Sequence, residues 1–161
     1  MTTSVPEMDP ARLLEEEARL ALPSLSEADA IAIGQLILAR AEERSLPVAL
    51  EVRRTSRVMF RAARAGSSSD NDAWIAGKAA VVERFGHSSW YMRRRYLAEG
   101  TTFEEATGLL PPVFRAVGGG YPLIVAGTGP VGVALVSGLP QEQDHALLVE
   151  CLEAYLAGAR A

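Results

Sequence analysis

The fold is decided by an uncharged stretch in the C-terminal half of the chain, AVGGGYPLIVAGTGPVGVALVSGLP at residues 116–140. These 25 residues would be long enough to cross a bilayer as a helix. Seven glycines and three prolines interrupt the stretch, so ten of its 25 positions favour turns. The composition therefore predicts short buried strands joined by glycine turns, and it excludes a membrane span.

Five strands are expected in all. Three of them cover residues 113–117, 122–126 and 131–137, and the glycines from Gly127 to Gly132 form a hairpin turn because a strand, not a helix, follows them. Earlier in the chain, alternation of period two predicts a hairpin from residues 48–52 and 58–63. Consecutive strands joined by tight turns are antiparallel, so we expect a five-stranded antiparallel sheet.

Helices surround these strands in the sequence. Capping residues and helical spacing predict them over residues 10–22, 24–44, 73–85, 90–98, 102–108 and 141–157. The second is expected to begin with a capping box of Ser24 and Glu27. The resulting class is α+β, with a helical N-terminal arm at residues 1–23 and one domain at residues 24–161.

Composition bounds the class of protein. The chain has 161 residues, of which 48% are apolar and 22% charged, as in an ordinary globular domain. The only cysteine, Cys151, permits no disulfide within the chain, and the start lacks a secretory signal, so we expect a cytoplasmic protein. A calculated pI of 5.3 disfavours a nucleic-acid partner.

Charge is distributed unevenly along the chain. Residues 1–45 hold nine acidic and four basic residues, residues 46–100 hold five and ten, and residues 101–161 hold six and two. A basic middle third between acidic flanks indicates either attraction between the segments, within a subunit or across an oligomer, or a site for an anion in the middle third.

Lys78 is the most informative single residue, because it is the only lysine in the chain. It falls near the middle of the apolar arc of its predicted helix, which is formed by Trp74, Ile75, Ala79, Val81, Val82 and Phe85. An ammonium on such a face either reaches past the sheet edge, pairs with a carboxylate, meets an anionic ligand or loses its proton. The alternatives are a structural ion pair and a ligand-binding or nucleophilic amine.

Asp144 and His145 supply a candidate partner for that amine. Both lie in the first turn of the last helix, in or beside the arc that faces the core. They are interpreted either as an ordinary first-turn acid and a neutral core imidazole, or as residues that close one polar pocket with Lys78.

His87, Ser88 and Ser89 stand at a break between two predicted helices. A loop of this kind can bring side chains to a ligand, although Ser88 or Ser89 is better explained as the cap of the following helix. The two histidines lack the His-x-x-x-His spacing of a helical metal site, so no metal site is predicted. One histidine could still serve as an axial ligand of haem.

Several of these segments together resemble the haem-degrading-domain (GlcG/HbpS-like) family, and within it the UPF0303 branch of uncharacterised proteins. The resemblance covers residues 25–158 and rests on GSSSDNDAW at 66–74, Lys78, RFGHSS at 84–89, GGGYPL at 118–123, VSGL at 136–139 and Asp144-His145.

This resemblance implies a profilin-like three-layer α-β-α sandwich with a five-stranded antiparallel sheet. It also implies a homodimer or larger ring, and haem as a possible cofactor. The recurrent positions of the family that match here are Asn71, Trp74, Lys78, Phe85, His87, Ser88, Ser89, Asp144 and His145. Our candidate ligand-binding residues among them are Asn71, Lys78, His87, Ser88, Ser89, Asp144 and His145.

The sequence thus predicts an oligomeric domain that binds a small anionic molecule, haem being one candidate, near Lys78 and His87. One alternative is an enzyme that uses Lys78 as a base or nucleophile. Another is a non-catalytic scaffold for protein interaction, whose function is assembly itself.

Overall fold

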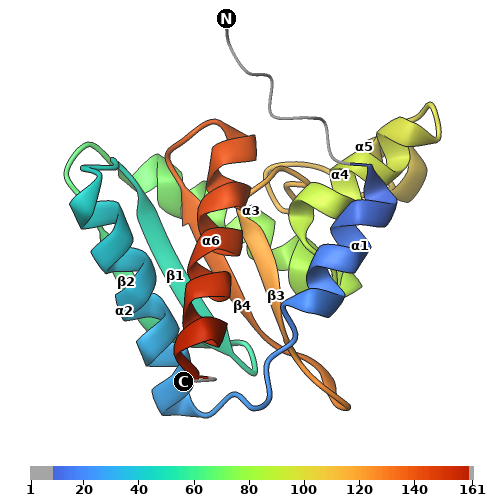
Figure 1. Ribbon diagram of the computed structural model, residues 1–161. Helices are drawn as coiled ribbons and strands as arrows, with labels where there is room; N and C mark the ends of the chain where they lie inside the picture. The colour runs from blue at the N-terminus through green and yellow to red at the C-terminus, as the bar shows by residue number, and fades with distance from the viewer. Residues whose placement is uncertain (1–8, 160–161) are drawn as a thin grey trace, which may run out of the picture.

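A computed structural model describes residues 9–159 and confirms the α+β class. Apart from a strand expected at residues 113–117, the helices and strands follow one another in the order expected from the sequence (Figure 1). Their bounds are α1 Pro10–Arg19, α2 Glu27–Glu43, β1 Ala49–Arg54, β2 Arg57–Ala63, α3 Ser69–Phe85, α4 Ser89–Ala98, α5 Phe103–Thr107, β3 Gly120–Val125, β4 Gly129–Ser137 and α6 Gln141–Ala159.

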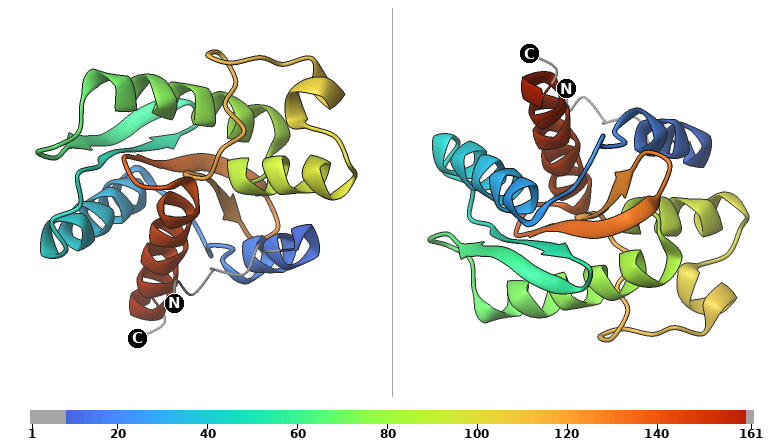
Figure 2. Two further views of the ribbon diagram at one scale, coloured as in Figure 1. Left: turned by 90° about the horizontal axis from the view of Figure 1, so that it is seen from above. Right: turned by 90° about the horizontal axis from the view of Figure 1, so that it is seen from below.

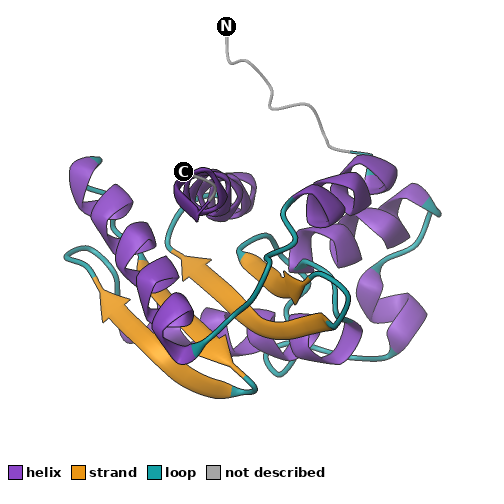
Figure 3. Ribbon diagram, turned by 60° about the horizontal axis from the view of Figure 1, so that its bottom comes forward, coloured by secondary structure: helices purple, strands orange, loops and turns teal. Residues whose placement is uncertain are grey.

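The sheet consists of two hairpins that pair through their inner strands. The strand order is β2-β1-β4-β3, and every neighbouring pair is antiparallel (Figure 3). Thr55 and Ser56 turn the first hairpin with positive φ angles, as a tight turn between twisted strands requires. The glycine-rich stretch at 127–129 turns the second, so the predicted hairpin turn there is confirmed.

Helices cover both faces of the sheet (Figure 2). On one face, α2 and α6 bury the larger apolar cluster, which includes Ile33, Ile37, Leu50, Val136 and Leu148. On the other face, α3 packs through Ile75, Ala79 and Val82 against small or branched residues of the strands. Because both faces are covered, the central strands are buried on both sides, and a polar side chain that points from them must find a partner inside the protein.

The prediction of five strands is wrong, because residues 113–117 form no strand. This segment runs along α3 instead: the Arg115 amide donates to the Gly77 carbonyl at 3.0 Å, and the Arg115 guanidinium lies 3.7 Å from the centre of the Trp74 ring. Phe114 and Ala116 pack on a second apolar cluster beside α4. Packing on a helix therefore accounts for the apolar residues that suggested a strand.

Two helices also begin elsewhere than predicted. The capping box of α2 is formed by Ser26 and Asp29, whose side chains each accept a hydrogen bond from the other's amide at 3.0 and 2.8 Å, and not by Ser24 and Glu27. Helix α3 begins at Ser69, four residues early, because the Asn71 side chain accepts a hydrogen bond from the Ser68 amide at 2.9 Å. Asn71 is thereby fixed in the first turn of α3.

Helix α1, which the sequence assigned to an N-terminal arm, packs against α4 (Figure 1). Leu13 is fully buried in the cluster beside α4. The chain then runs beside the outer edge of β3, where the Leu22 amide donates to the Ile124 carbonyl at 2.7 Å. A domain boundary at residue 23 stays a prediction. Among residues 9–159, no helix has both the length and the apolar character that crossing a bilayer demands.

The packing of α2 generates a stability prediction. Ile37 is fully buried between α2 and the sheet, whereas Ile31 on the same helix is 38% exposed. Ile37→Ala should lower the free energy of unfolding by about 2–5 kcal/mol because it leaves a cavity, and Ile31→Ala should change it by less than about 1 kcal/mol. Urea unfolding of both variants measures this, and equal losses would contradict the assignment of the buried face.

Candidate functional site

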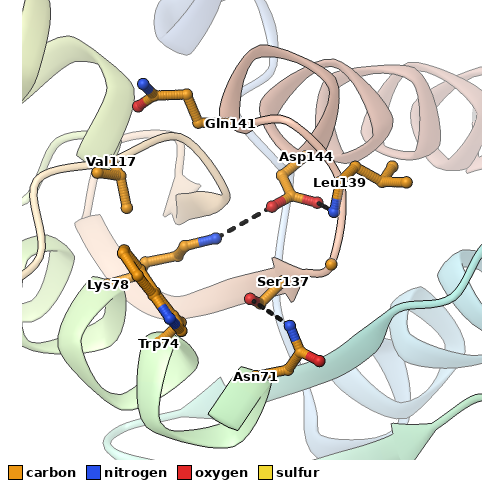
Figure 4. A pocket seen from close by; sticks show the side chains of 9 residues that line it. Asn71, Trp74, Lys78, Val117, Ser137, Leu139, Gln141 and Asp144 are labelled. Atoms are coloured by element: carbon orange, nitrogen blue, oxygen red, sulfur yellow. Dashed lines mark hydrogen bonds and ion pairs between the residues drawn. The ribbon is translucent and has the colours of Figure 1, made fainter. Parts of the chain in front are cut away.

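A cavity of about 380 Å³ lies where α3, the end of β4 and the start of α6 meet (Figure 4). This volume is within the range of small-molecule sites. It is lined by Asn71, Trp74, Lys78, Val117, Ser137, Gly138, Leu139, Gln141 and Asp144. Three residues that the sequence predicted for the site, Asn71, Lys78 and Asp144, are therefore brought together here.

Lys78 extends from α3 across the end of β4, and its side chain is 3% exposed. Its Nζ donates to the Val136 carbonyl at 2.8 Å and to Asp144 Oδ2 at 3.2 Å. The predicted pairing of Lys78 with Asp144 is thus observed. An ammonium has three N–H donors, and the described residues accept from two of them. The third is left for another acceptor.

The glycine run before β3 makes room for this amine. Gly119 has φ +120°, which other residues rarely adopt, and a Cβ on it would collide with Lys78 Nζ and with the Val136 carbonyl. The Val136 amide in turn donates to the Gly119 carbonyl at 2.8 Å. Glycine at this position lets the backbone pass close over the amine while β4 remains paired.

Burial perturbs both charged groups of the pair. Loss of solvent lowers the pKa of Lys78, and the Arg115 guanidinium lowers it further, while the Asp144 carboxylate acts to raise it. Burial raises the pKa of Asp144 to about 6, against the opposing effects of Lys78 and of the Leu139 amide. That amide donates to Asp144 Oδ1 at 3.1 Å. Burial would therefore disfavour the Lys78 ammonium or the Asp144 carboxylate if either were charged without the other. Hydrogen bonds to the Val136 carbonyl and from the Leu139 amide hold the charged pair.

Polar groups also line the opposite wall of the cavity. Asn71 Nδ2 donates to Ser137 Oγ at 3.2 Å, which joins the first turn of α3 to the end of β4. Figure 4 shows this contact below the Lys78 amine. The cavity thus offers hydroxyl, amide, ammonium and carboxylate groups beside the Trp74 ring.

The structure places His87 and His145 outside this cavity, where each pairs with a glutamate of α1. His145 is buried, and its Nε2 lies 2.9 Å from Glu16 Oε1. His87 is half-buried, and its Nδ1 lies 2.7 Å from Glu17 Oε2. His145 follows Asp144 directly in α6. His145 pairs with Glu16 of α1, and Asp144 pairs with Lys78 in the cavity.

Ser88 and Ser89 are fully buried, and their hydroxyls take part in the fold. Ser88 Oγ accepts from the Tyr91 amide at 3.0 Å, which confirms that Ser88 caps the following helix. Ser89 Oγ accepts from the Gly120 amide at 2.9 Å and so positions the start of β3. A role for either hydroxyl in ligand binding stays a prediction.

Five residues with a part in these surroundings were not predicted from the sequence: Glu16, Glu17, Arg115, Ser137 and Gln141. For the two glutamates a signal exists, since Leu13, Glu16, Glu17 and Leu20 recur at the spacing of one helix face. For Ser137 the signal is its place in the VSGL motif at 136–139, whereas no sequence signal distinguishes Arg115 and Gln141 from surface residues. Within residues 9–159 no group of three or more His, Cys, Asp or Glu side chains is arranged to hold a metal ion.

Comparison with known proteins identifies the family of this chain. A family model described as haem degrading protein HbpS-like matches residues 25–153. The chain belongs to this HbpS-like family. A UPF0303 protein of Streptomyces coelicolor is 48% identical over 146 residues, which are 91% of this chain and 92% of that protein. The resemblance to the UPF0303 branch is thereby confirmed.

Solved structures share the fold of this HbpS-like chain. The crystal structure of the Ybr137w protein matches with a TM-score of 0.85 and 30% identity, over 92% of this chain and 88% of that chain. The crystal structure of a PduOC:haem complex matches with a TM-score of 0.67 over 81% of this chain and 94% of that chain. At 18% identity, the second match shows a common fold alone.

The buried pair generates a prediction about Lys78. In Asp144→Asn the carboxylate that favours the ammonium is lost, so the pKa of Lys78 should fall below its value in the unaltered chain, which is itself below the ordinary 10.5. Because the chain has one lysine, labelling lysine with carbon-13 at Cε gives a single side-chain NMR signal to follow against pH.

Glu142→Gln is the matched control, because Glu142 is an exposed acid in the same first turn of α6. It should leave the Lys78 midpoint in place. A midpoint at 10.5 in the unaltered chain would contradict the effect of burial, and with it the alternative that Lys78 acts as a base or nucleophile.

Proposed function

We propose that the chain is a small-molecule-binding domain whose cavity takes a small carboxylate or similar anion at Lys78. The observation that carries the proposal is a buried ammonium in a cavity of about 380 Å³ with one N–H left for a further acceptor. A hydrogen bond between an ammonium and an anion is about twice as strong as one between neutral groups.

Local charge supports an anion rather than a cation. Lys78 and Arg115 supply two positive charges, and Asp144 supplies one negative charge. A monovalent anion would balance this small cluster without adding a further buried charge.

The Trp74 ring supports a ligand with a flat apolar part. Trp74 lines the cavity, and the Arg115 guanidinium lies 3.7 Å from the centre of its ring. A guanidinium over the ring fixes the indole in place and adds positive charge near it. Val117 and Leu139 add apolar side chains to the lining. An aromatic carboxylate such as benzoate combines both features and is a suitable test compound.

The test is a calorimetric titration of the chain with benzoate. Lys78→Met combined with Asp144→Asn removes both charges without leaving one unpaired, and it should weaken benzoate binding at least about tenfold. Arg57→Met removes a cation on an exposed part of β2 and should leave binding unchanged. Equal affinities for the double variant and the unaltered chain would overturn the proposal.

Haem binding at His87 is the second candidate function. Glu17 holds His87 Nδ1, and among the described residues Nε2 of this half-buried ring has no partner. A carboxylate behind an imidazole is the arrangement that orients histidine toward a metal. His87 and Glu17 therefore fit an axial ligand and its support, and when bound the iron would supply redox chemistry. The haem complex of the related PduOC fold supports testing this.

A haem titration separates the two histidines. His87→Ala should weaken the change in the Soret band, because it removes the accessible nitrogen, whereas His145→Ala should keep it, because His145 is 3% exposed. The absence of any Soret change, or an unchanged one in His87→Ala, would remove this candidate.

Self-association and a cytoplasmic location belong to the same proposal. The chain has a single, buried cysteine and so forms no disulfide within itself, which suits a reducing compartment. A monomer by light scattering at micromolar concentration would contradict self-association as a homodimer or ring.

A further inference from the structure

Helix α1 places two carboxylates on the face that packs against the rest of the protein. Leu13, Glu16, Glu17 and Leu20 recur at i, i+3, i+4 and i+7, and each is at most 6% exposed. Glu15, between them, points to solvent. The buried stripe of α1 is therefore acidic in its middle and apolar at its ends.

The surface that receives α1 is complementary to this stripe. We call the α1-contact surface the set formed by His87, the Ser88 amide, His145 and the side chains that share one buried apolar cluster with Leu13, which are Val81, Trp90, Tyr91, Met92, Phe103 and Ala116. These residues come from the end of α3, the turn before α4, the start of α4, α5, the loop at 108–119 and the start of α6.

Each carboxylate meets donors suited to an anion. Glu17 Oε1 accepts from the Ser88 amide at 2.7 Å, at the N-terminus of α4, while its other oxygen meets His87. Helix N-termini attract negative charge through their free amides and the helix dipole. Glu16 meets His145 and lies near the buried Tyr121 hydroxyl, whose pKa is raised by burial and also by Glu16 and Glu17.

His145 contributes to this surface a buried nitrogen without a hydrogen-bond partner among residues 9–159. His145 Nδ1 makes no hydrogen bond with any described residue, and the side chain is only 4% exposed. Glu16 of α1 pairs with one nitrogen of this buried imidazole, so the side chain would keep no hydrogen-bond partner among the described residues if α1 left. Without an acidic helix on it, this surface would leave His87, the Ser88 amide and His145 without their carboxylate partners.

The receiving surface, but not α1, lies within the residues that match the HbpS-like family model, 25–153. We propose that the α1-contact surface is a binding site for acidic amphipathic helices of partner proteins, and that α1 occupies it in the resting chain. The pattern that it recognises is a leucine followed at i+3 and i+4 by two glutamates. This is the helix-in-groove mode of recognition with carboxylates among the anchors.

A partner helix competes with α1 for the same contacts. Because α1 is tethered through the short segment at 20–26, its effective concentration at the surface is high, so a free helix binds well only when the contacts of α1 are weakened. This consequence makes the proposal testable in the full-length chain.

The probe is a fluorescent peptide with the sequence of residues 9–22, DPARLLEEEARLAL. The double substitution Glu16→Ala and Glu17→Ala in the chain keeps helix propensity but removes both carboxylates. It should lower hydrogen-exchange protection of the α1 amides on the order of tenfold or more. It should also raise the affinity for the peptide by a similar factor relative to the unaltered chain.

Three controls make the outcome specific. Glu15→Ala in the chain should change neither quantity, because Glu15 is exposed. A peptide with alanine at positions 16 and 17 should bind at least about tenfold more weakly than the native one. Adding His87→Ala to the double variant should reduce the gain in affinity, and the far-ultraviolet circular dichroism of each variant establishes that it is folded.

Equal binding of the two peptides, or no gain in the double variant, would overturn the proposal. A concentration-dependent dimer of the unaltered chain that the double variant abolishes would also overturn it, since α1 of a second copy would then be the occupant.

Discussion

Burial of the Lys78 ammonium with the Asp144 carboxylate is the interaction around which three elements are arranged. It joins the middle of α3, the end of β4 and the first turn of α6. Removing an ion from water costs several kcal/mol even after relaxation, so such a pair is stable only when further hydrogen bonds complete it. The Val136 carbonyl and the Leu139 amide provide them, and Gly119 leaves the space that they require.

The first turn of α6 connects this pair to the other side of the molecule. Asp144 faces the cavity beneath α3, while His145 faces Glu16 of α1. The two buried polar clusters therefore share one stretch of backbone, from which Asp144 and His145 point in different directions. Both depend on the same physical requirement, that a charged or polar group in a low-dielectric interior has a partner on a neighbouring element.

The proposed anion site and the proposed haem ligand are separate in space, although the sequence grouped Lys78 and His87 in one region. Lys78 lies at the floor of the cavity, and His87 is held outside the lining by Glu17 of α1. Membership in the HbpS-like family is compatible with both. The different surroundings explain why one part of the chain offers a buried ammonium and another a half-buried imidazole.

The sequence by itself determined the α+β class, both hairpins, the approximate bounds of the helices and the unusual position of Lys78. These follow from local rules: alternation, capping, turn residues and one lysine on an apolar helical arc. Tertiary structure alone decided that residues 113–117 follow α3 instead of adding a fifth strand, and that His145 and His87 are the partners of Glu16 and Glu17. An apolar segment fits a helix surface as well as a sheet edge, and a glutamate on a helix reads as exposed unless its distant partner is known. His87 and His145 lie 70 and 129 residues from those glutamates, and only folding brings such partners together.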